Sequence, residues 1–391
     1  MVESQANIVK MYISIADEPN ATAYFDKLIS KFGQSAGIAA AVENVAQEYL
    51  ELRNTQKAYE KFHYILEHWP ESDRAIWAKT GMAMSRIRGL DLEAGESELL
   101  ELLDKYSQDK KLPDAVHEIV EEYRNAGAYT EGREVFEYLL KNPFEGAGTM
   151  LELQVGIALQ SIKLGEPNKV EAAVDKLIAD YNDHPNIAKG LFQIGEEYWY
   201  VKNCSEAIKL WELILNEYPD SQFENKSETP YVLAVCYKSL GNPDKAIEYY
   251  EMMLDNSPAH RFAERIPYKL GVLYRGKGDF AEAVHWFGQQ RQLYSSELYA
   301  RRSLLQQAAV YYYDLKDYEK ATEAYGRYKD KYPDDKRASV AYLLLARSHE
   351  KMGNRDEAIK ILAEASEKFA ASDGGGEIAE ELARMREGGE K

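Results

Sequence analysis

The sequence predicts an all-α protein made of about ten helical hairpins, followed by a short C-terminal helix. Three observations predict this class. Apolar residues recur at spacings of three and four, which places them on one face of a helix. A pattern of small and aromatic residues returns every 36 to 39 residues along nearly the whole chain. A single hairpin cannot bury its apolar face, so we expect successive hairpins to stack into a solenoid.

The stretch from Thr229 to Ser257 shows the repeating unit most clearly. We expect its first helix to end at Gly241, because glycine adopts the left-handed conformation without a Cβ clash. Pro243 is tolerated in the first turn of the second helix. Four residues are expected to form the seam between the two helices: Ala234, Ala246, Tyr237 and Tyr250.

The small residue that opens the second helix of this unit has equivalents along the chain, which we call anchors. The ten anchors counted from the sequence are Ala21, Ala58, Ala94, Gly132, Val170, Ala207, Ala246, Ala283, Ala321 and Ala358. A tyrosine lies nine residues before most anchors, and an aromatic residue lies four residues after most of them. These two columns account for much of the chain's 29 tyrosines.

This pattern resembles the tetratricopeptide repeat over about residues 2–371, although that family usually has a period of ~34 residues. The resemblance implies a right-handed superhelical solenoid. It also implies a concave groove, lined by the first helices of the hairpins, that holds an extended peptide. Joints such as Tyr218 to Ser221 resemble the longer repeats of the bacterial tol-pal coordinator and of outer-membrane-assembly lipoproteins.

The expected domains are one array over residues 2–371, a flexible break at 372–376 and a C-terminal capping helix at 377–387. In the last helix Ile378, Leu382 and Met385 fall on one stripe, which favours a cap over the exposed end of the array. The alternative is a docking segment for another chain. Glycines weaken helix interiors, so we expect a softer joint between Gly81 and Gly148.

The net charge of −18 and the pI near 5.0 argue against a nucleic-acid partner, which would require clustered Lys and Arg. No apolar run is long enough for direct membrane insertion. Two cysteines, Cys204 and Cys236, are too few to indicate a disulfide framework. We expect both to be small core or loop residues.

Motifs of catalysis and of cofactor binding are not found. The sequence has no Gly-rich phosphate loop, no GxSxG elbow, no HExxH and no paired CxxC. His63 and His68 are five residues apart, so they diverge on a helix and do not indicate a metal site. We therefore expect no enzymatic activity, no catalytic residue, no metal and no cofactor.

Residues beside the tyrosine column point away from the packed face, so they are candidates for the groove. The predicted groove residues are Arg86, Arg124, Phe192, Trp199, Tyr200, Tyr231, Lys238, Tyr268, Arg275 and Gln306. Exposed aromatic residues beside cations are typical of interface hot spots. The alternative is that these are ordinary solvated helix residues, with Arg and Lys paired to Glu.

The resulting functional hypothesis is a non-catalytic scaffold that binds a peptide or protein partner, whose acidic groups the groove cations would hold. A protein that binds carbohydrate or cell-envelope glycan through the same aromatic residues is the alternative. Self-association through the end repeats is a third reading. The start inside a helix suggests a segment of a longer protein. The compartment is cytoplasmic if Met1 is native and periplasmic if the segment comes from an exported envelope protein.

Overall fold

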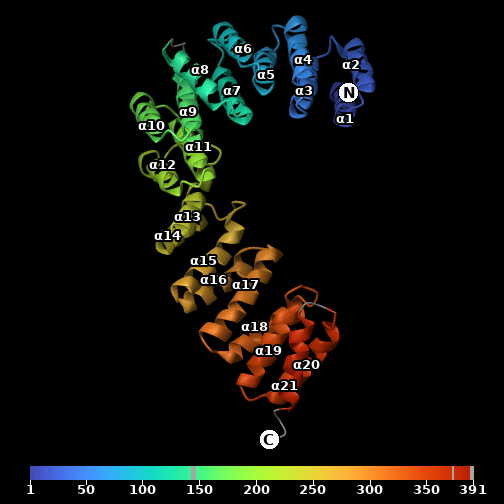
Figure 1. Ribbon diagram of the computed structural model, residues 1–391, viewed down its shortest axis with the longest axis vertical. Helices are drawn as coiled ribbons and strands as arrows, with labels where there is room; N and C mark the ends of the chain where they lie inside the picture. The colour runs from blue at the N-terminus through green and yellow to red at the C-terminus, as the bar shows by residue number, and fades with distance from the viewer. Residues whose placement is uncertain (142–146, 372–373, 388–391) are drawn as a thin grey trace. The chain divides into compact units, whose positions relative to one another are not determined.

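The computed structural model describes residues 1–141, 147–371 and 374–387. Within these residues it contains twenty-one α-helices and no β-strand, so the predicted all-α class is confirmed. The helices form two compact units, residues 1–226 (unit 1) and 227–391 (unit 2) (Figure 1). They pair along the chain as ten hairpins, each with an odd-numbered first helix and an even-numbered second helix.

Unit 1 holds six hairpins. Its helices are α1 (Val2–Ser14), α2 (Glu18–Phe32), α3 (Ile38–Glu51), α4 (Thr55–His68), α5 (Ala75–Arg88), α6 (Leu92–Lys105), α7 (Leu112–Ala126), α8 (Tyr129–Lys141), α9 (Ala147–Lys163), α10 (Pro167–Tyr181), α11 (Ile187–Tyr200) and α12 (Cys204–Glu217). A single 3-10 turn, η1 (Lys226–Glu228), follows at the division between the units.

Unit 2 holds four hairpins and the last helix. Its helices are α13 (Thr229–Ser239), α14 (Pro243–Asn256), α15 (Ile266–Lys277), α16 (Phe280–Leu293), α17 (Glu297–Ala309), α18 (Tyr318–Lys331), α19 (Ala338–Lys351), α20 (Arg355–Lys368) and α21 (Gly375–Glu387). A 3-10 turn, η2 (Ala263–Arg265), precedes α15. A π-helical turn, η3 (Val310–Asp314), ends α17.

Each hairpin turns at one residue with a positive φ angle. These turn residues are Ala16, Arg53, Leu90, Gly127, Gly165, Lys202, Gly241, Gly278, Lys316 and Gly353. The residue that follows begins the second helix as its N-cap. In the hairpin of α13 and α14, for example, the Asn242 side chain accepts a hydrogen bond from the Lys245 backbone N–H at 3.1 Å. This common turn keeps the repeat period regular, because it fixes where every second helix begins.

The turn at Leu90 corrects the anchor of the third hairpin. In the other nine hairpins the anchor lies five residues after the turn residue, which in the third is Gly95 and not Ala94. Gly95 is buried, whereas Ala94 is half-buried. A Cβ atom on Gly95 would come within 2.7 Å of Ile87 Cγ1, so any larger residue would force the Ile87 side chain to shift. Positions counted from Ala94 in this hairpin are therefore shifted by one residue.

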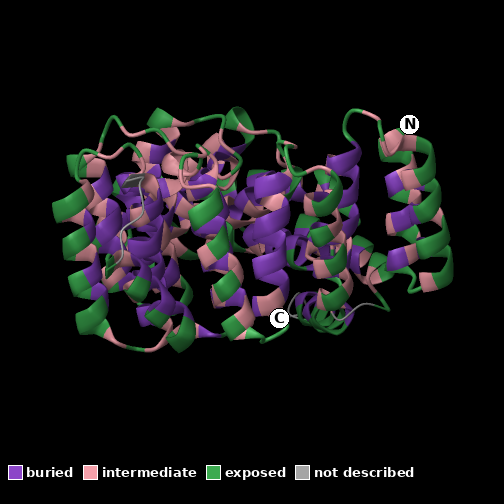
Figure 2. Cartoon of the chain, turned by 90° about the horizontal axis from the view of Figure 1, so that it is seen from above, coloured by how far each residue is buried: buried purple, intermediate pink, exposed green. Residues whose placement is uncertain are grey.

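The core follows the two sequence columns. Buried and exposed residues occupy opposite faces of individual helices (Figure 2). All ten anchors, with Gly95 in the third place, are buried. The residues four places later are Phe25, Phe62, Leu99, Phe136, Val174, Trp211, Tyr250, Phe287, Tyr325 and Leu362. All of them are buried except Val174, which is half-buried.

The glycines that suggested a soft joint have packing roles. Gly81 is buried, and a Cβ atom there would lie 2.4 Å from the Phe62 ring. The exit segment of this region, residues 142–146, lies outside the described residues. A softer joint between Gly81 and Gly148 stays a prediction, because close packing at a glycine does not by itself report on mobility.

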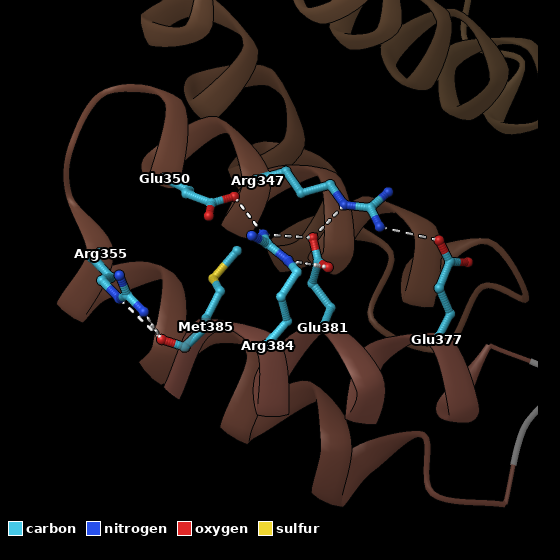
Figure 3. Close-up of polar contacts among 7 residues, drawn as sticks. All are labelled: Arg347, Glu350, Arg355, Glu377, Glu381, Arg384 and Met385. Carbon is cyan, nitrogen blue, oxygen red and sulfur yellow. Dashed lines mark hydrogen bonds and ion pairs between the residues drawn. The ribbon is translucent and has the colours of Figure 1, made fainter. Parts of the chain in front are cut away.

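The last helix covers the end of unit 2. Ile378, Leu382 and Met385 are buried in the same hydrophobic cluster as α19 and α20. Figure 3 shows the polar contacts around them. Arg347 on α19 bonds to Glu381 at 2.6 Å, and Arg384 reaches back to Glu350 at 2.7 Å. These contacts fasten α21 to α19 beside its apolar stripe.

The chain boundaries differ in part from those expected. Helix α21 begins at Gly375, inside the expected break at 372–376, of which residues 372 and 373 lie outside the described residues. The expected single array over 2–371 comprises two compact units. The flexibility of the break and the right-handed sense of the solenoid stay predictions. Cys204 and Cys236 are both buried, and neither is a free thiol.

Candidate partner-binding surface

The ten predicted groove residues all lie on first helices, and they divide between the two units. Arg86, Arg124, Phe192, Trp199 and Tyr200 belong to unit 1, on α5, α7 and α11. Tyr231, Lys238, Tyr268, Arg275 and Gln306 belong to unit 2, on α13, α15 and α17. The predicted groove residues therefore fall in both units, and each part is described separately below.

The sequence prediction assigned Arg86 to the groove because positions in the third hairpin were counted from Ala94 instead of Gly95. Counted from Gly95 it occupies the tyrosine column, nine residues before the anchor. Its guanidinium group stacks over the Tyr59 ring, 4.0 Å from the centroid, and pairs with Asp91 at 3.4 Å. Arg86 is thus a packing residue that takes the place of a tyrosine ring.

Phe192 is a second correction, because only 2% of it is exposed. Its ring packs on Trp211 of α12 with the centroids 6.0 Å apart. Phe223, from the segment after α12, covers it at 5.4 Å. This cover was missed in the sequence analysis, because Phe223 lies outside the helical repeat pattern. Phe192 therefore belongs to the core of unit 1.

Arg124 is held by carboxylates of the chain itself. It pairs with Glu121 on the same helix and with Glu197 on α11, the latter at 2.6 Å. Burial lowers the pKa of the Arg124 guanidinium, but these two carboxylates outweigh burial and raise it. Lys163 on α9 pairs with the other oxygen of Glu197 at 2.5 Å, and the Glu197 side chain is 1% exposed.

Two further pairs of this kind were missed at the sequence level. Arg88 on α5 donates from Nε to Glu122 on α7 at 2.7 Å. His117 on α7 lies 3.1 Å from Glu152 on α9. We call the contacts Arg88–Glu122, Arg124–Glu197, Lys163–Glu197 and His117–Glu152 the first-helix row. The sequence does contain a signal for such pairs, which is the spacing between a cation and a carboxylate. Three of the contacts join residues 34 or 35 apart: Arg88–Glu122, Lys163–Glu197 and His117–Glu152.

In unit 2, two of the predicted groove residues, Arg275 and Gln306, contact each other. Arg275 donates from Nε to Asp314 at 2.7 Å and from Nη1 to Gln306 Oε1 at 2.9 Å. These three residues line an open hollow of about 600 Å³ together with Val272, Gly276, Lys277, Gly278 and Phe280. The charge of Arg275 is thus balanced inside the chain.

Tyr231 and Tyr268 are half-buried by neighbouring aromatic rings. Tyr231 packs on Phe262 with the centroids 4.6 Å apart, and Lys269 Nζ lies 5.5 Å above its ring. Tyr268 lies near Phe287 and Tyr299, at 6.0 and 6.1 Å. Both tyrosines are therefore only partly accessible to a partner.

Three predicted residues remain open to solvent. Tyr200 is 58% exposed at the end of α11, and the half-buried Trp199 ring lies 5.5 Å from it. Lys238 is exposed at the end of α13, and no ion pair is found for it in the part of the chain that the structure describes. These are the predicted side chains that a partner could contact directly.

No group of three or more His, Cys, Asp or Glu side chains in residues 1–141, 147–371 and 374–387 is arranged to hold a metal ion. Over the same ranges, every helix is too short or too polar to span a lipid bilayer.

Family models of the tetratricopeptide repeat match three segments of the chain. One model matches residues 302–335 and 340–372, and a second matches residues 231–260. All three segments lie in unit 2, where they cover the hairpins of α13 and α14, α17 and α18, and α19 and α20. A comparison with curated proteins found no match.

Similar solved structures include the P58(IPK) TPR domain, with 14% identity over 100% of this chain and 99% of that chain and a TM-score of 0.30. PilF of Pseudomonas aeruginosa has 18% identity, covering 58% of this chain and 95% of that chain, with a TM-score of 0.35. The human IFIT1 dimer with m7Gppp-AAAA has 16% identity, covering 94% and 81%, with a TM-score of 0.36. Scores this low carry no functional information about this chain.

The resemblance of the joints to the tol-pal coordinator is not confirmed by these matches. The repeat itself is confirmed, because the matched segments coincide with hairpins that share one turn geometry with the rest of the chain. The matches and the ten hairpins support a tetratricopeptide repeat protein, with matched repeats in residues 231–260, 302–335 and 340–372.

Proposed function

We propose that this chain is a non-catalytic scaffold that binds a peptide or protein partner along the first helices of its hairpins, in the groove that the family presents there. The observation that carries the proposal is the match of three segments to tetratricopeptide repeat models, because such domains typically bind protein partners. The repeating hairpins account for nearly all of the described chain, and their regular period leaves no room for an inserted catalytic domain.

The contact residues that support the proposal are fewer than the sequence suggested. Trp199, half-buried, and Tyr200, exposed, supply an aromatic pair in unit 1, which is the residue type that anchors interfaces. In unit 2, Lys238 supplies an exposed charge, and Arg275 and Gln306 line the 600 Å³ hollow.

The electrostatic part of the hypothesis changes accordingly. Arg86, Arg124 and Arg275 are paired with Asp91, Glu197 and Asp314. A partner rich in acidic groups is therefore not required for binding at these positions. We propose that the aromatic pair contributes most of the affinity and that Lys238 contributes orientation and association rate.

The test is affinity capture of partners from a lysate of the source cells by the full chain, followed by mass spectrometry. Trp199→Ala with Tyr200→Ser should reduce the captured partner by about tenfold, and Lys238→Glu should reduce it less. The matched control is Tyr138→Ser on the second helix α8, where an equally exposed tyrosine is removed. Equal capture by wild type and by the Trp199 and Tyr200 variant would sink the proposal.

Glycan binding and self-association are separated by two further measurements on the full chain. The scaffold proposal expects no signal on a glycan array, so binding there would favour the glycan reading of the same aromatic pair. Light scattering at increasing concentration reports self-association. A mass that doubles with concentration would place a second copy among the partners.

A further inference from the structure

A furrow in unit 1 lies on the side opposite to the proposed groove. It encloses about 490 Å³ between the second helices α10 and α12, with Tyr198 of α11 beneath them. Figure 1 shows α10 and α12 together on one side of α9 and α11. Pockets of this size hold drug-sized groups or a few side chains. We call this hollow the α10–α12 furrow.

The equivalent place between α2 and α4 is closed by side chains of the chain itself. Phe25 of α2 is buried there, and Lys61 Nζ of α4 lies 3.9 Å above its ring. The Tyr49 hydroxyl donates to Glu18 at 2.8 Å, and Lys57 of α4 pairs with the same carboxylate. An aromatic ring, two lysines and a carboxylate thus fill this junction.

Every one of these closing groups is changed in the α10–α12 furrow. Val174 stands at the position of Phe25, and Pro167 stands at that of Glu18. Glu206 and Leu210 replace Lys57 and Lys61. Tyr198 stands at the position of Tyr49, but the Pro167 side chain cannot accept a hydrogen bond from its hydroxyl group as Glu18 does from Tyr49. The furrow is open because the ring, both lysines and the acceptor carboxylate are missing together.

The rim of the furrow is acidic and its floor is apolar. Glu171 and Asp175 are exposed on α10, and Glu206 lies opposite on α12, where it pairs with Lys209 at 2.8 Å. Burial and then the charges of Glu206 and Glu171 raise the pKa of Tyr198 to about 12, so both carboxylates act on the floor. Three carboxylates against one lysine leave a negative rim.

We propose that the α10–α12 furrow binds a polypeptide segment in which a large aromatic side chain lies next to lysine or arginine. The aromatic ring would rest on Val174 and Leu210, in the place that Phe25 fills between α2 and α4. The adjacent cation would reach Glu171, Asp175 or Glu206, as Lys57 reaches Glu18. The furrow is therefore a second interaction surface, on the second helices, and it does not depend on the proposed groove.

The test uses the full chain and a fluorescein-labelled peptide that repeats Lys-Phe-Lys-Gly, with binding followed by fluorescence anisotropy. Two peptides separate the contributions: Lys-Ala-Lys-Gly lacks the ring, and Glu-Phe-Glu-Gly reverses the charge. We expect the first peptide to bind at least about tenfold more tightly than either control. Equal affinity of the Lys-Phe-Lys-Gly and Lys-Ala-Lys-Gly peptides would overturn the proposal, because an acidic protein attracts any basic peptide.

Two variants locate the binding. Val174→Phe with Glu206→Lys restores the closing residues of the α2–α4 junction and should weaken binding by about tenfold or more. Glu171→Gln with Asp175→Asn leaves the floor intact and should also weaken binding. The matched control is Glu248→Lys, which makes the same charge change as Glu206→Lys on an exposed face of α14. An equal loss with Glu248→Lys, or no loss with either furrow variant, would overturn the proposal.

Discussion

The first-helix row and the α10–α12 furrow both carry acidic side chains, but these side chains differ in burial and in ion pairing. In the row, Glu122 and Glu197 are each 1% exposed, and both are paired with cations from neighbouring first helices. In the furrow, Glu171 and Asp175 are exposed, and no ion pair is found for either within the described chain. A buried carboxylate needs a partner inside the protein, whereas an exposed one stays available to a ligand.

A row of cations in a repeat protein is open to a partner only where no carboxylate of a neighbouring hairpin holds it. Arg124 was predicted to hold a partner's acidic groups, but both Arg124 and Lys163 are held by Glu197, a carboxylate of a later hairpin. Their charge stabilises the stacking of hairpins. In the furrow only Glu206 is paired, with Lys209, while no ion pair is found for Glu171 or Asp175 within the described chain, so the furrow is the better candidate for electrostatic attraction.

The largest expected effect comes from breaking the row. Arg124→Met with Lys163→Met leaves Glu197 buried without a cation, which should lower the free energy of unfolding by about 3 kcal/mol. Urea unfolding of the full chain, followed by circular dichroism, measures the change. Adding Glu197→Gln should recover part of the loss, because the buried charge is then removed.

The control for this variant is Lys209→Met with Lys360→Met, which removes two exposed lysines that pair within their own helices. This control should stay within about 0.5 kcal/mol of wild type. If the row variant is as stable as the control, the pairs around Glu197 contribute nothing to stacking.

A smaller effect is expected from opening the closed junction between α2 and α4. Phe25→Val with Lys57→Glu copies two residues of the α10–α12 furrow and should cost about 2 kcal/mol of stability, mostly from the lost ring. The variant should also bind a second equivalent of the Lys-Phe-Lys-Gly peptide, measured by calorimetric titration. Phe25→Val alone keeps Lys57 in place and should bind one equivalent. An unchanged stoichiometry in the double variant would show that these residues do not distinguish the two junctions.

The smallest expected effect concerns the pH dependence of the row. Burial lowers the pKa of His117, but the hydrogen bond and charge of Glu152 outweigh it and raise the pKa above 6.5. A raised pKa in the folded state means that this contact stabilises fully below pH 6.5 and loses its effect as the pH rises through the folded-state value. His117→Gln should therefore lower stability more in acid than in alkali, by less than about 1 kcal/mol.

Unfolding of wild type and His117→Gln at a series of pH values measures this difference. The control is the same substitution in a Glu152→Gln background, where the loss of stability should no longer be larger in acid, because burial then lowers the pKa of His117. A difference between wild type and variant that is constant with pH would contradict the role of Glu152 in charging His117.

Much of the fold could be predicted because local residue types repeat. The anchors, the buried residues four places later and the turn at Gly241 follow from spacing alone. Where spacing was ambiguous, the prediction was wrong: Ala94 and Gly95 are both small, and only the turn at Leu90 distinguishes them. The groove assignment of Arg86 depended on that choice.

The candidate surface was less predictable, because exposure depends on residues distant in sequence. Phe192 is covered by Phe223, and Arg275 is balanced by Asp314, 39 residues away. The furrow did have a sequence signal: Val174 stands in a column otherwise filled by aromatic residues and leucine. A small residue in that column indicates missing volume, but not whether a neighbour fills it.

The sequence by itself determined that this chain forms stacked helical hairpins, because a helix period and a repeat period are properties of residue order. Only the tertiary structure decided which charges are satisfied and which surfaces are open. Ion pairs such as Arg124–Glu197 join residues 73 positions apart, and the opening at Val174 depends on what α12 places beside it. Both depend on packing between hairpins, which a one-dimensional pattern does not contain.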